Sequence, residues 1–354
     1  MNAIINDIEI IKAKTTKINE VDFDNLKFGQ VFSDHMLECN YKNGAWEVPK
    51  VVPYHAITLD PSAKIFHYGQ SVFEGMKAYK DANNEVWLFR PLENFKRLNI
   101  SSKRLAIPEL PEAYFMDGLK ALLEVDKDWI PNKEGSSLYI RPFVFATGKG
   151  FHASPADEYK FIISTAPSGA YFAGKVKVLI EQTYSRSANG GVGYAKAGGN
   201  YAGQFYPTQL AVEKGYQQVI WTDDTNHEYI EEAGAMNIFI RINDTLITGP
   251  TSDRILDGIT RKSIIDLAKS ENIPVEVRKI SVKEVVEAAK NGSLKEMFGA
   301  GTAAVISPID GFGYQGTDYD LPKLDKTYAE YLKKRITDIQ TNKSEDPFGW
   351  RYKV

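Results

Sequence analysis

A lysine set among glycines is the residue of this chain whose surroundings most favour chemistry. Lys196 lies in the segment GGVGYAKAGGNY, residues 190–201, which contains five glycines. Glycine lets a backbone turn sharply and lets a flat ligand approach closely. A lysine buried in such a segment would lose its proton more readily, because burial disfavours the charged form. The neutral amine is a nucleophile toward carbonyl groups and forms Schiff bases with carbonyl cofactors such as pyridoxal phosphate (PLP).

A flexible glycine-rich loop with an exposed lysine would give the same pattern, and for an isolated motif that interpretation is the more frequent one. The choice depends on the rest of the chain, because PLP makes further demands on a protein. A carboxylate must face the ring nitrogen, and a donor must hold the ring hydroxyl. The phosphate needs backbone N–H groups, as at a helix N-terminus, together with a cation.

The composition is that of an ordinary soluble globular protein with room for two domains. The 354 residues are 43% hydrophobic and 25% charged. A net charge of −3 gives no electrostatic reason to expect binding to nucleic acid or to an anionic membrane. The single cysteine, Cys39, predicts no intrachain disulfide and a cytoplasmic protein. We find neither a signal-peptide pattern nor a run near the ~20 apolar residues of a membrane span.

The sequence lacks the residues that several other kinds of catalytic site require. The five histidines are not paired at metal-ligand spacing, and no cysteine cluster accompanies them, so we expect no metal. The sequence also contains no phosphate-binding P-loop, no Gly-x-Gly-x-x-Gly after a strand and no Gly-x-Ser-x-Gly.

Alternating strand-like and helix-like runs predict a mixed α/β architecture in both halves. In the first half we expect strands over 31–39, 85–89, 138–146 and 161–165, and helices over 91–104 and 111–125. In the second half we expect strands over 176–180, 218–222 and 303–309, a hairpin over 236–248, and helices over 201–214, 260–269, 281–292 and 322–339. We expect Thr260 to cap its helix and Pro322 to lie in the first turn of the last one.

A break at PSGA, residues 167–170, suggests a boundary between domains. The prediction is a small N-terminal α/β domain over 1–166, a linker over 167–176 and a large C-terminal domain over 177–354 that carries Lys196.

The residues KAGGNY, from Lys196 to Tyr201, resemble the Schiff-base segment of branched-chain amino acid aminotransferases. That family belongs to fold type IV of the PLP enzymes, a mixed α+β and α/β fold of two domains with the cofactor at their interface. The segment EEAGAMN, residues 231–237, resembles the family's segment whose glutamate pairs with the pyridine nitrogen. The resemblance gives that role to Glu232 rather than Glu231, and it places Tyr201 at the ring hydroxyl.

Two further motifs resemble the family's phosphate and substrate loops. LDGITR, residues 256–261, is similar to the phosphate-binding turn, in which the N–H groups of Ile259 and Thr260 open a helix onto the phosphate. GAGTA, residues 299–303, resembles the closing loop. By that resemblance the Thr302 hydroxyl binds the phosphate, and the Thr302–Ala303 backbone holds the substrate carboxylate.

Motifs before the linker match the family too. HYGQSVFEGMKAY, residues 67–79, resembles the small-domain signature, and FRPLENFKR places Arg97 where the family has its phosphate-contacting arginine. An aromatic pocket for the substrate side chain is expected from Phe28, Tyr68, Phe73, Tyr139 and Tyr171. Arg141 with Tyr68 is the expected site for the side-chain carboxylate of glutamate. Tyr68, Phe73 and Tyr139 also fit plain core positions.

The resemblance implies a transaminase that moves the amino group of L-leucine, L-isoleucine or L-valine to 2-oxoglutarate in a ping-pong cycle. Lys196 would hold PLP and act as the base. A neighbouring subunit would complete the pocket, which implies a homodimer. D-amino acid transaminase and aminodeoxychorismate lyase share the fold and remain alternatives. A non-catalytic PLP-binding protein would be expected to lack Lys196 or Glu232. Backbone donors without an arginine in the closing loop favour L-amino acids.

Two positions depart from the pattern of some family members. Ala235 stands where they have a threonine, so a hydroxyl contact to the cofactor is lost. The run from Ala304 to Ser307 replaces a Cys-x-x-Cys pair, so no redox switch is expected.

Overall fold

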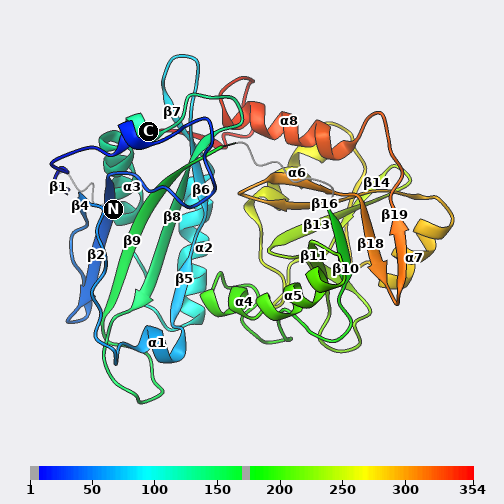
Figure 1. Ribbon diagram of the computed structural model, residues 1–354, viewed down its shortest axis with the longest axis horizontal. Helices are drawn as coiled ribbons and strands as arrows, with labels where there is room; N and C mark the ends of the chain where they lie inside the picture. The colour runs from blue at the N-terminus through cyan, green and yellow to red at the C-terminus, as the bar shows by residue number, and fades with distance from the viewer. Residues whose placement is uncertain (1–7, 170–175) are drawn as a thin grey trace. The chain divides into compact units, whose positions relative to one another are not determined.

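The structure is a computed structural model that describes residues 8–169 and 176–354 (Figure 1). The chain divides into two compact units. The N-terminal unit contains the described residues up to 169 together with 195–198 and 338–354, and the C-terminal unit contains 176–194 and 199–337. Within the described residues, each unit is built on one ten-stranded sheet.

The sheet of the N-terminal unit is mostly antiparallel, and its longest pairing is the β8–β9 hairpin. Its main path, in spatial order, is β1 (Glu9–Ile10), β4 (Lys50–Pro53), β2 (His35–Lys42), β9 (Tyr159–Ser168), β8 (Ser137–Ala146), β6 (Met76–Lys80), β7 (Val86–Phe89) and β20 (Arg351–Lys353). Off this path, β3 (Ala45–Trp46) pairs with β2, and β5 (Ser71–Phe73) pairs with β8. The helices are α1 (Lys64–Tyr68), α2 (Pro91–Arg104) and α3 (Glu112–Val125), with 3-10 turns at Ile18–Glu20 and Lys127–Trp129.

Helix α3 covers this sheet through an apolar stripe. Phe115, Leu119, Leu122 and Leu123 are fully buried, as their helical spacing predicts. Gly118 lets the helix approach β2 closely, since a Cβ there would lie 2.6 Å from a methyl carbon of Leu37. The stripe joins Leu37, Leu98, Leu138 and Phe161 in one core. That core fixes α2 and the strands that carry the candidate site residues.

The sheet of the C-terminal unit mixes parallel and antiparallel pairs. Its path is β15 (Val275–Val277), β14 (Thr245–Thr248), β13 (Met236–Ile242), β12 (Ile230–Ala233), β11 (Gln218–Thr222), β10 (Lys177–Ile180), β18 (Gly311–Tyr314) and β19 (Thr317–Asp320). β16 (Leu294–Gly301) pairs with β13 and with β17 (Val305–Ile309). The helices are α4 (Gly198–Ala202), α5 (Phe205–Glu213), α6 (Ile259–Ser270), α7 (Val282–Lys290) and α8 (Tyr328–Gln340).

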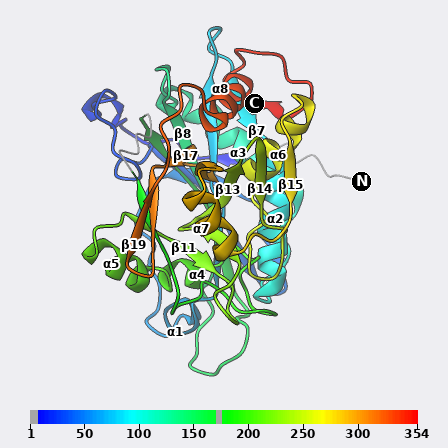
Figure 2. The ribbon, with the colours of Figure 1, turned by 90° about the vertical axis from the view of Figure 1, so that its right-hand side faces the viewer.

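Helix α7 packs its apolar face on this sheet, and Figure 2 shows it in front of the strands. Val282 and Val285 are buried against a core that includes Ile238 and Ile240. One half of the predicted capping box is confirmed, because the Ser281 side chain accepts a hydrogen bond from the backbone N–H of Glu284. The Glu284 carboxylate accepts from Arg278. None of the helices in the described parts of the chain is long and apolar enough to cross a membrane.

Three expectations about helix ends were wrong. The helix predicted over 201–214 is two helices, α4 and α5, which are separated at Gly203 and Gln204. Thr260 does not cap α6, since the helix already begins at Ile259. Pro322 lies before α8, and Thr327 begins that helix instead: its hydroxyl accepts from the N–H of Glu330.

The two units differ from the predicted domains in two places. Residues 338–354 join the N-terminal unit because β20 pairs with β7. Residues 195–198 join it because Ala197 bridges Val72 and Phe73 donates to Lys196. Lys196 therefore belongs to the N-terminal unit, although we had expected the large C-terminal domain to carry it. Most of the predicted linker, 170–175, lies outside the described residues.

Candidate active site

Lys196 is fixed through its own backbone in the N-terminal unit. Its N–H donates to Ser101 Oγ on α2 at 2.9 Å, and its carbonyl accepts from the N–H of Phe73 at 3.0 Å. The side chain is half-buried, and Nζ lies 4.9 Å from the centre of the Phe73 ring. The interpretation of Lys196 as an exposed residue in a flexible loop is therefore wrong.

Three predicted pocket aromatics gather with Arg141 on this unit. The rings of Phe28 and Tyr139 meet edge to face at 4.8 Å. The Arg141 guanidinium lies 4.7 Å from the Phe73 ring centre, and its Nη2 donates to the Tyr139 hydroxyl at 3.0 Å. Among the described residues the buried Nε of Arg141 has no hydrogen-bond partner. A buried guanidinium nitrogen without a partner is suited to a carboxylate guest.

Tyr68 does not join this cluster. It is 44% exposed, and its hydroxyl donates to the carbonyl of Phe151. Within one chain the structure therefore does not bring Tyr68 to Arg141, because the Tyr68 side chain is turned toward the loop of Phe151. The expected role of Tyr68 in substrate binding stays a prediction. Tyr171, the other aromatic residue expected in the pocket, lies outside the described residues.

Arg97 is held by a glutamate that sequence reasoning missed. Arg97 Nε and Nη2 donate to the two carboxylate oxygens of Glu74 at 2.7 and 2.8 Å, and Asn94 donates to the same group. Burial opposes ionisation of Glu74, but the charge and hydrogen bonds of Arg97, with help from the charge of Lys196, outweigh it and lower its pKa. Glu74 thus orients Arg97. The motif FEGM contained the signal, since a glutamate before a glycine in a buried strand region needs a partner.

In the C-terminal unit, Glu232 lies at the centre of a cross-strand row. It pairs in register with Trp221 on β11 and Asn237 on β13, and Asn237 pairs with Ala300 on β16. Glu232 is buried, and its Oε1 accepts from Asn237 Nδ2 at 3.0 Å. Arg186 Nε lies 2.8 Å from Glu232 Oε2. The carboxylate is therefore held by a charge and an amide, and it is not the exposed hairpin acid that was the alternative.

The turn before α6 is built to receive an anion. α6 begins at Ile259 after Gly258, and no side chain caps its first turn. Its first N–H groups, those of Ile259 and Thr260, therefore offer the positive end of a twelve-residue helix. Asn237 ties this turn to Glu232, since its Nδ2 also donates to the Leu256 carbonyl at 2.9 Å.

Residues 71–312 match the model of the amino-transferase class IV family. The chain belongs to this family. It is 43% identical over 349 residues to branched-chain-amino-acid aminotransferase 2 of Bacillus subtilis, a match that covers 97% of this chain and 96% of that protein. It is 40% identical over 348 residues to the branched-chain-amino-acid aminotransferase of Mycolicibacterium smegmatis, covering 95% and 94% of the two chains.

Solved structures confirm the predicted fold. The crystal structure of Escherichia coli branched-chain amino acid aminotransferase superposes with a TM-score of 0.73 at 26% identity, covering 90% of this chain and 98% of that one. The T.th. branched-chain amino acid aminotransferase, solved with pyridoxamine 5'-phosphate, gives a TM-score of 0.72 at 25% identity, covering 89% and 97%. This class IV aminotransferase therefore has the type IV fold that its motifs predicted.

The segment that resembles the family's closing loop, residues 299–303, lies at the end of β16, the strand that pairs with β13. β16 ends at Gly301 and β17 begins at Val305, so Thr302, Ala303 and Ala304 form the turn between them. Val305 has a φ of 61°, which is a strained value for a β-branched residue. Tyr201 lies in α4 and is half-buried.

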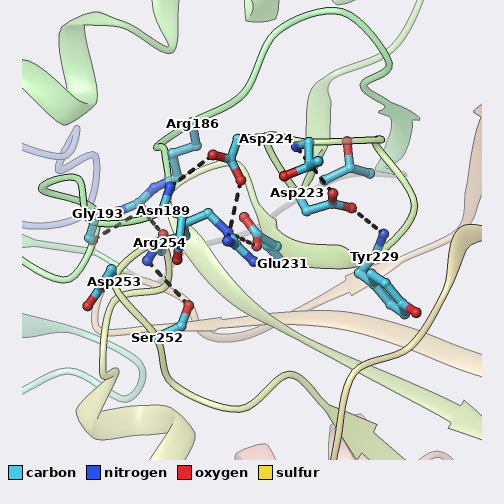
Figure 3. A network of polar contacts seen from close by, with 12 residues as sticks. Arg186, Asn189, Gly193, Asp223, Asp224, Tyr229, Glu231, Ser252, Asp253 and Arg254 are labelled. Carbon is cyan, nitrogen blue, oxygen red and sulfur yellow. Dashed lines mark hydrogen bonds and ion pairs between the residues drawn. The ribbon is translucent and has the colours of Figure 1, made fainter.

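Hydrogen bonds tie the glycine-rich segment that precedes Lys196, residues 187–194, to other parts of the C-terminal unit (Figure 3). Tyr194 N donates to the Asp253 carbonyl at 3.0 Å, and Asn189 N donates to Asp224 at 2.9 Å. A Cβ on Gly193 would lie 2.6 Å from the carbonyl oxygen of Arg254. Only glycine permits this approach. Across the described chain, no group of three or more His, Cys, Asp or Glu side chains is arranged to hold a metal ion.

Gly258→Ala is expected to weaken retention of PLP by about tenfold or more, because a Cβ there would overlap Asn237 Oδ1 and push the amide off both Glu232 and the turn. Dialysis followed by reconstitution, with bound cofactor followed by absorbance, measures this. Gly203→Ala is the matched control, since its Cβ would meet only ordinary contacts. Equal retention of PLP in both variants would contradict the idea that Asn237 couples Glu232 to the turn before α6.

Asp223→Asn is expected to lower the free energy of unfolding at pH 7 by about 1–3 kcal/mol. Burial opposes ionisation of Asp223, but four backbone N–H groups, including that of Tyr229 at 2.6 Å, outweigh it and lower its pKa (Figure 3). A lowered pKa stabilises the folded chain above the ordinary value of 3.8, and this contribution is lost as the pH falls through the folded pKa. Urea unfolding at several pH values should show the difference between wild type and variant shrinking in acid. The exposed Asp244→Asn should show none.

Proposed function

We propose that this chain is a branched-chain-amino-acid aminotransferase that transfers the amino group of L-leucine, L-isoleucine or L-valine to 2-oxoglutarate. The observation that supports this proposal is the cluster of side chains around Lys196. Phe28, Phe73 and Tyr139 offer an apolar surface for a branched side chain, and the buried Nε of Arg141 offers a partner for the second carboxylate of glutamate. A pocket for both substrates must combine these two properties.

The residues of each unit fit PLP as the cofactor. The N-terminal unit supplies the lysine and Arg97, which Glu74 orients. The C-terminal unit supplies a buried carboxylate at Glu232 and an uncapped helix N-terminus. We propose that Lys196 links to the cofactor, Glu232 faces its ring nitrogen and Tyr201 holds its ring hydroxyl. The residues proposed to bind its phosphate are Arg97, Ile259, Thr260 and Thr302.

When bound, PLP supplies a carbonyl that takes up the amino group and a ring that withdraws electrons from the reacting carbon. The chain's own groups do the rest. Lys196 Nζ would take the proton from the substrate α-carbon and deliver it to the cofactor carbon that receives the amino group, and the second half-reaction would run this transfer in reverse. Glu232 keeps a proton on the ring nitrogen, because an ionised carboxylate beside it favours the charged form. The Thr302–Ala303 backbone holds the substrate α-carboxylate, and Arg141 holds the side-chain carboxylate of glutamate.

The direct test is incubation of the purified protein with L-leucine and 2-oxoglutarate, scored for glutamate. We expect glutamate from L-leucine, L-isoleucine and L-valine, and little turnover of D-alanine or L-aspartate. Preference for D-alanine over L-leucine would indicate a D-amino acid transaminase, and release of pyruvate from aminodeoxychorismate would indicate a lyase. Cofactor binding without turnover of any of these substrates would indicate a PLP-binding protein.

We place the enzyme in the cytoplasm as a homodimer. The single cysteine suits a reducing compartment. A second copy is favoured by large aromatic side chains left exposed on α1 and the loop after β8, where Phe66 is 61% and Phe151 is 72% exposed. Light scattering after gel filtration should give twice the chain mass of 39.7 kDa. Phe66→Ser with Phe151→Ser should shift that mass toward one chain.

A further inference from the structure

Arg186 lies in the C-terminal unit, ten residues before the lysine, and sequence reasoning did not single it out. Its side chain is 3% exposed. Nη1 donates to the carbonyls of Gly193 at 3.2 Å and Arg254 at 2.7 Å, while Nε lies 2.8 Å from Glu232 Oε2. A single guanidinium thus joins the Glu232 carboxylate to the glycine-rich segment at Gly193 and to the chain at Arg254.

The contact with Glu232 acts through charge. Arg186 Nε lies within ion-pair distance of the carboxylate, but among the described residues its N–H does not point at an acceptor in hydrogen-bond geometry. Glu232 also interacts with the charge of Arg261 on α6, and that arginine is influenced by Asp257 as well. Trp221 and Asn237, the neighbours of Glu232 on β11 and β13, are neutral. The direct ion pair with Arg186 is therefore a main source of positive charge at this carboxylate.

A second arginine provides a natural comparison. Glu231 precedes Glu232 on the same strand, so the two side chains lie on opposite faces. Arg254 Nε pairs with Glu231 at 2.5 Å and Nη1 with Asp224 at 3.3 Å (Figure 3). Each glutamate of the pair thus has its own arginine. The ion pairs of the Arg254 side chain are made with carboxylates other than Glu232.

We propose that Arg186 is a positioning residue of the aminotransferase, which keeps Glu232 ionised and fixes the glycine-rich segment leading to Lys196. The proposal rests on the proposed function, in which Glu232 faces the ring nitrogen. Without the positive charge, a buried carboxylate takes up a proton at higher pH. Without the two hydrogen bonds from Nη1, the carbonyls of Gly193 and Arg254 lose their donor, and residues 187–194 are less firmly held.

The experiment compares Arg186→Gln, Arg186→Lys and the matched control Arg254→Gln. The first readout is the pH dependence of the half-reaction with L-leucine. The acid limb is the part of the pH–rate profile in which the rate falls because Glu232 takes up a proton. Arg186→Gln should move this limb upward by about one to three pH units, since removal of a charge partner at this distance shifts the pKa of a carboxylate by that amount. Arg186→Lys should restore most of the limb. Arg254→Gln should leave the acid limb in place. In a Glu232→Gln background, the further change Arg186→Gln should also leave the acid limb in place.

The second readout uses the protein without cofactor, so it does not depend on turnover. Hydrogen exchange of the backbone amides in 187–194 should accelerate about tenfold or more in Arg186→Gln and also in Arg186→Lys, because a lysine cannot reproduce the two-sided contact of a guanidinium. Melting by circular dichroism identifies a variant that does not fold, and Arg186→Lys then carries the test.

Two results would overturn the proposal. One is an unmoved acid limb in folded Arg186→Gln with unchanged exchange of 187–194. The other is an equal shift of the limb in Arg254→Gln, which would make the effect one of general packing. Absence of transamination in the wild-type protein would instead overturn the proposed function, and the exchange measurement would still report on the loop.

Discussion

Lys196→Ala is expected to abolish transamination, with turnover of L-leucine falling by at least about 10³-fold. The variant removes both the amine that links the cofactor and the base that moves the α-proton. Its neighbours should stay in place, because the backbone hydrogen bonds of residue 196 with Ser101 and Phe73 do not need the lysine side chain. The protein should lose its yellow colour after dialysis, while its melting temperature without cofactor should change little.

Lys283→Ala is the control for this experiment. That lysine is 84% exposed on α7 and lies near Glu287, so its removal tests the loss of one positive charge at the surface. A Lys196→Ala enzyme that turns over L-leucine at the normal rate would end the assignment of this lysine as the cofactor link.

Glu232→Gln is expected to lower the rate of the half-reaction by about 10²-fold while keeping the fold, because a neutral amide cannot hold a proton on the ring nitrogen. The amide fills the same space and still accepts from Asn237. Single-turnover mixing with L-leucine, followed by the cofactor absorbance, measures the rate separately from product release.

Glu231→Gln gives the contrasting result. The resemblance gives the ring-nitrogen role to Glu232, so we expect Glu231→Gln to change the rate of the half-reaction little. The structure adds a cost in the free energy of unfolding of about 1–3 kcal/mol, since the Arg254 Nε would lose the carboxylate that accepts its hydrogen bond. A large loss of rate in Glu231→Gln with a normal rate in Glu232→Gln would show that the motif had been aligned one residue out of register.

The parts of the fold that could be predicted from sequence are those with local signals. Pro91 in the first turn gave the start of α2, and the Ser281 capping box gave the start of α7. The last helix shows the limit of such signals. Both a proline and a Thr-x-x-Glu box precede it, and the hydrogen bond of Thr327 to Glu330 decided between them. The break at Gly203 was missed because nothing in the periodicity of residues 201–214 marks it.

The candidate site was predictable in proportion to its motifs. Resemblance placed Lys196, Glu232 and the turn before α6 in their segments, and the structure shows the local geometry that suits those roles. Glu74 and Arg186 were not singled out, because their importance comes from partners distant in sequence, Arg97 and Glu232. The direction of the Tyr68 side chain, toward Phe151, could not be predicted, because an aromatic motif does not reveal which way the ring turns. The roles given to Arg97, Tyr201 and Thr302 remain predictions.

The pairing of β20 with β7 bears on how this protein is made. Residues 351–353 complete the sheet of the N-terminal unit, and the N–H of Val354 bonds to the carbonyl of Val86. A ribosome makes these residues after the whole C-terminal unit, so a sheet whose first strands emerge early stays one strand short until then. During that period the edge of β7 is unpaired, and an unpaired edge strand can form hydrogen bonds with incorrect strands or with other chains. Completion of the second unit, rather than emergence of the first, is therefore the event that closes this sheet.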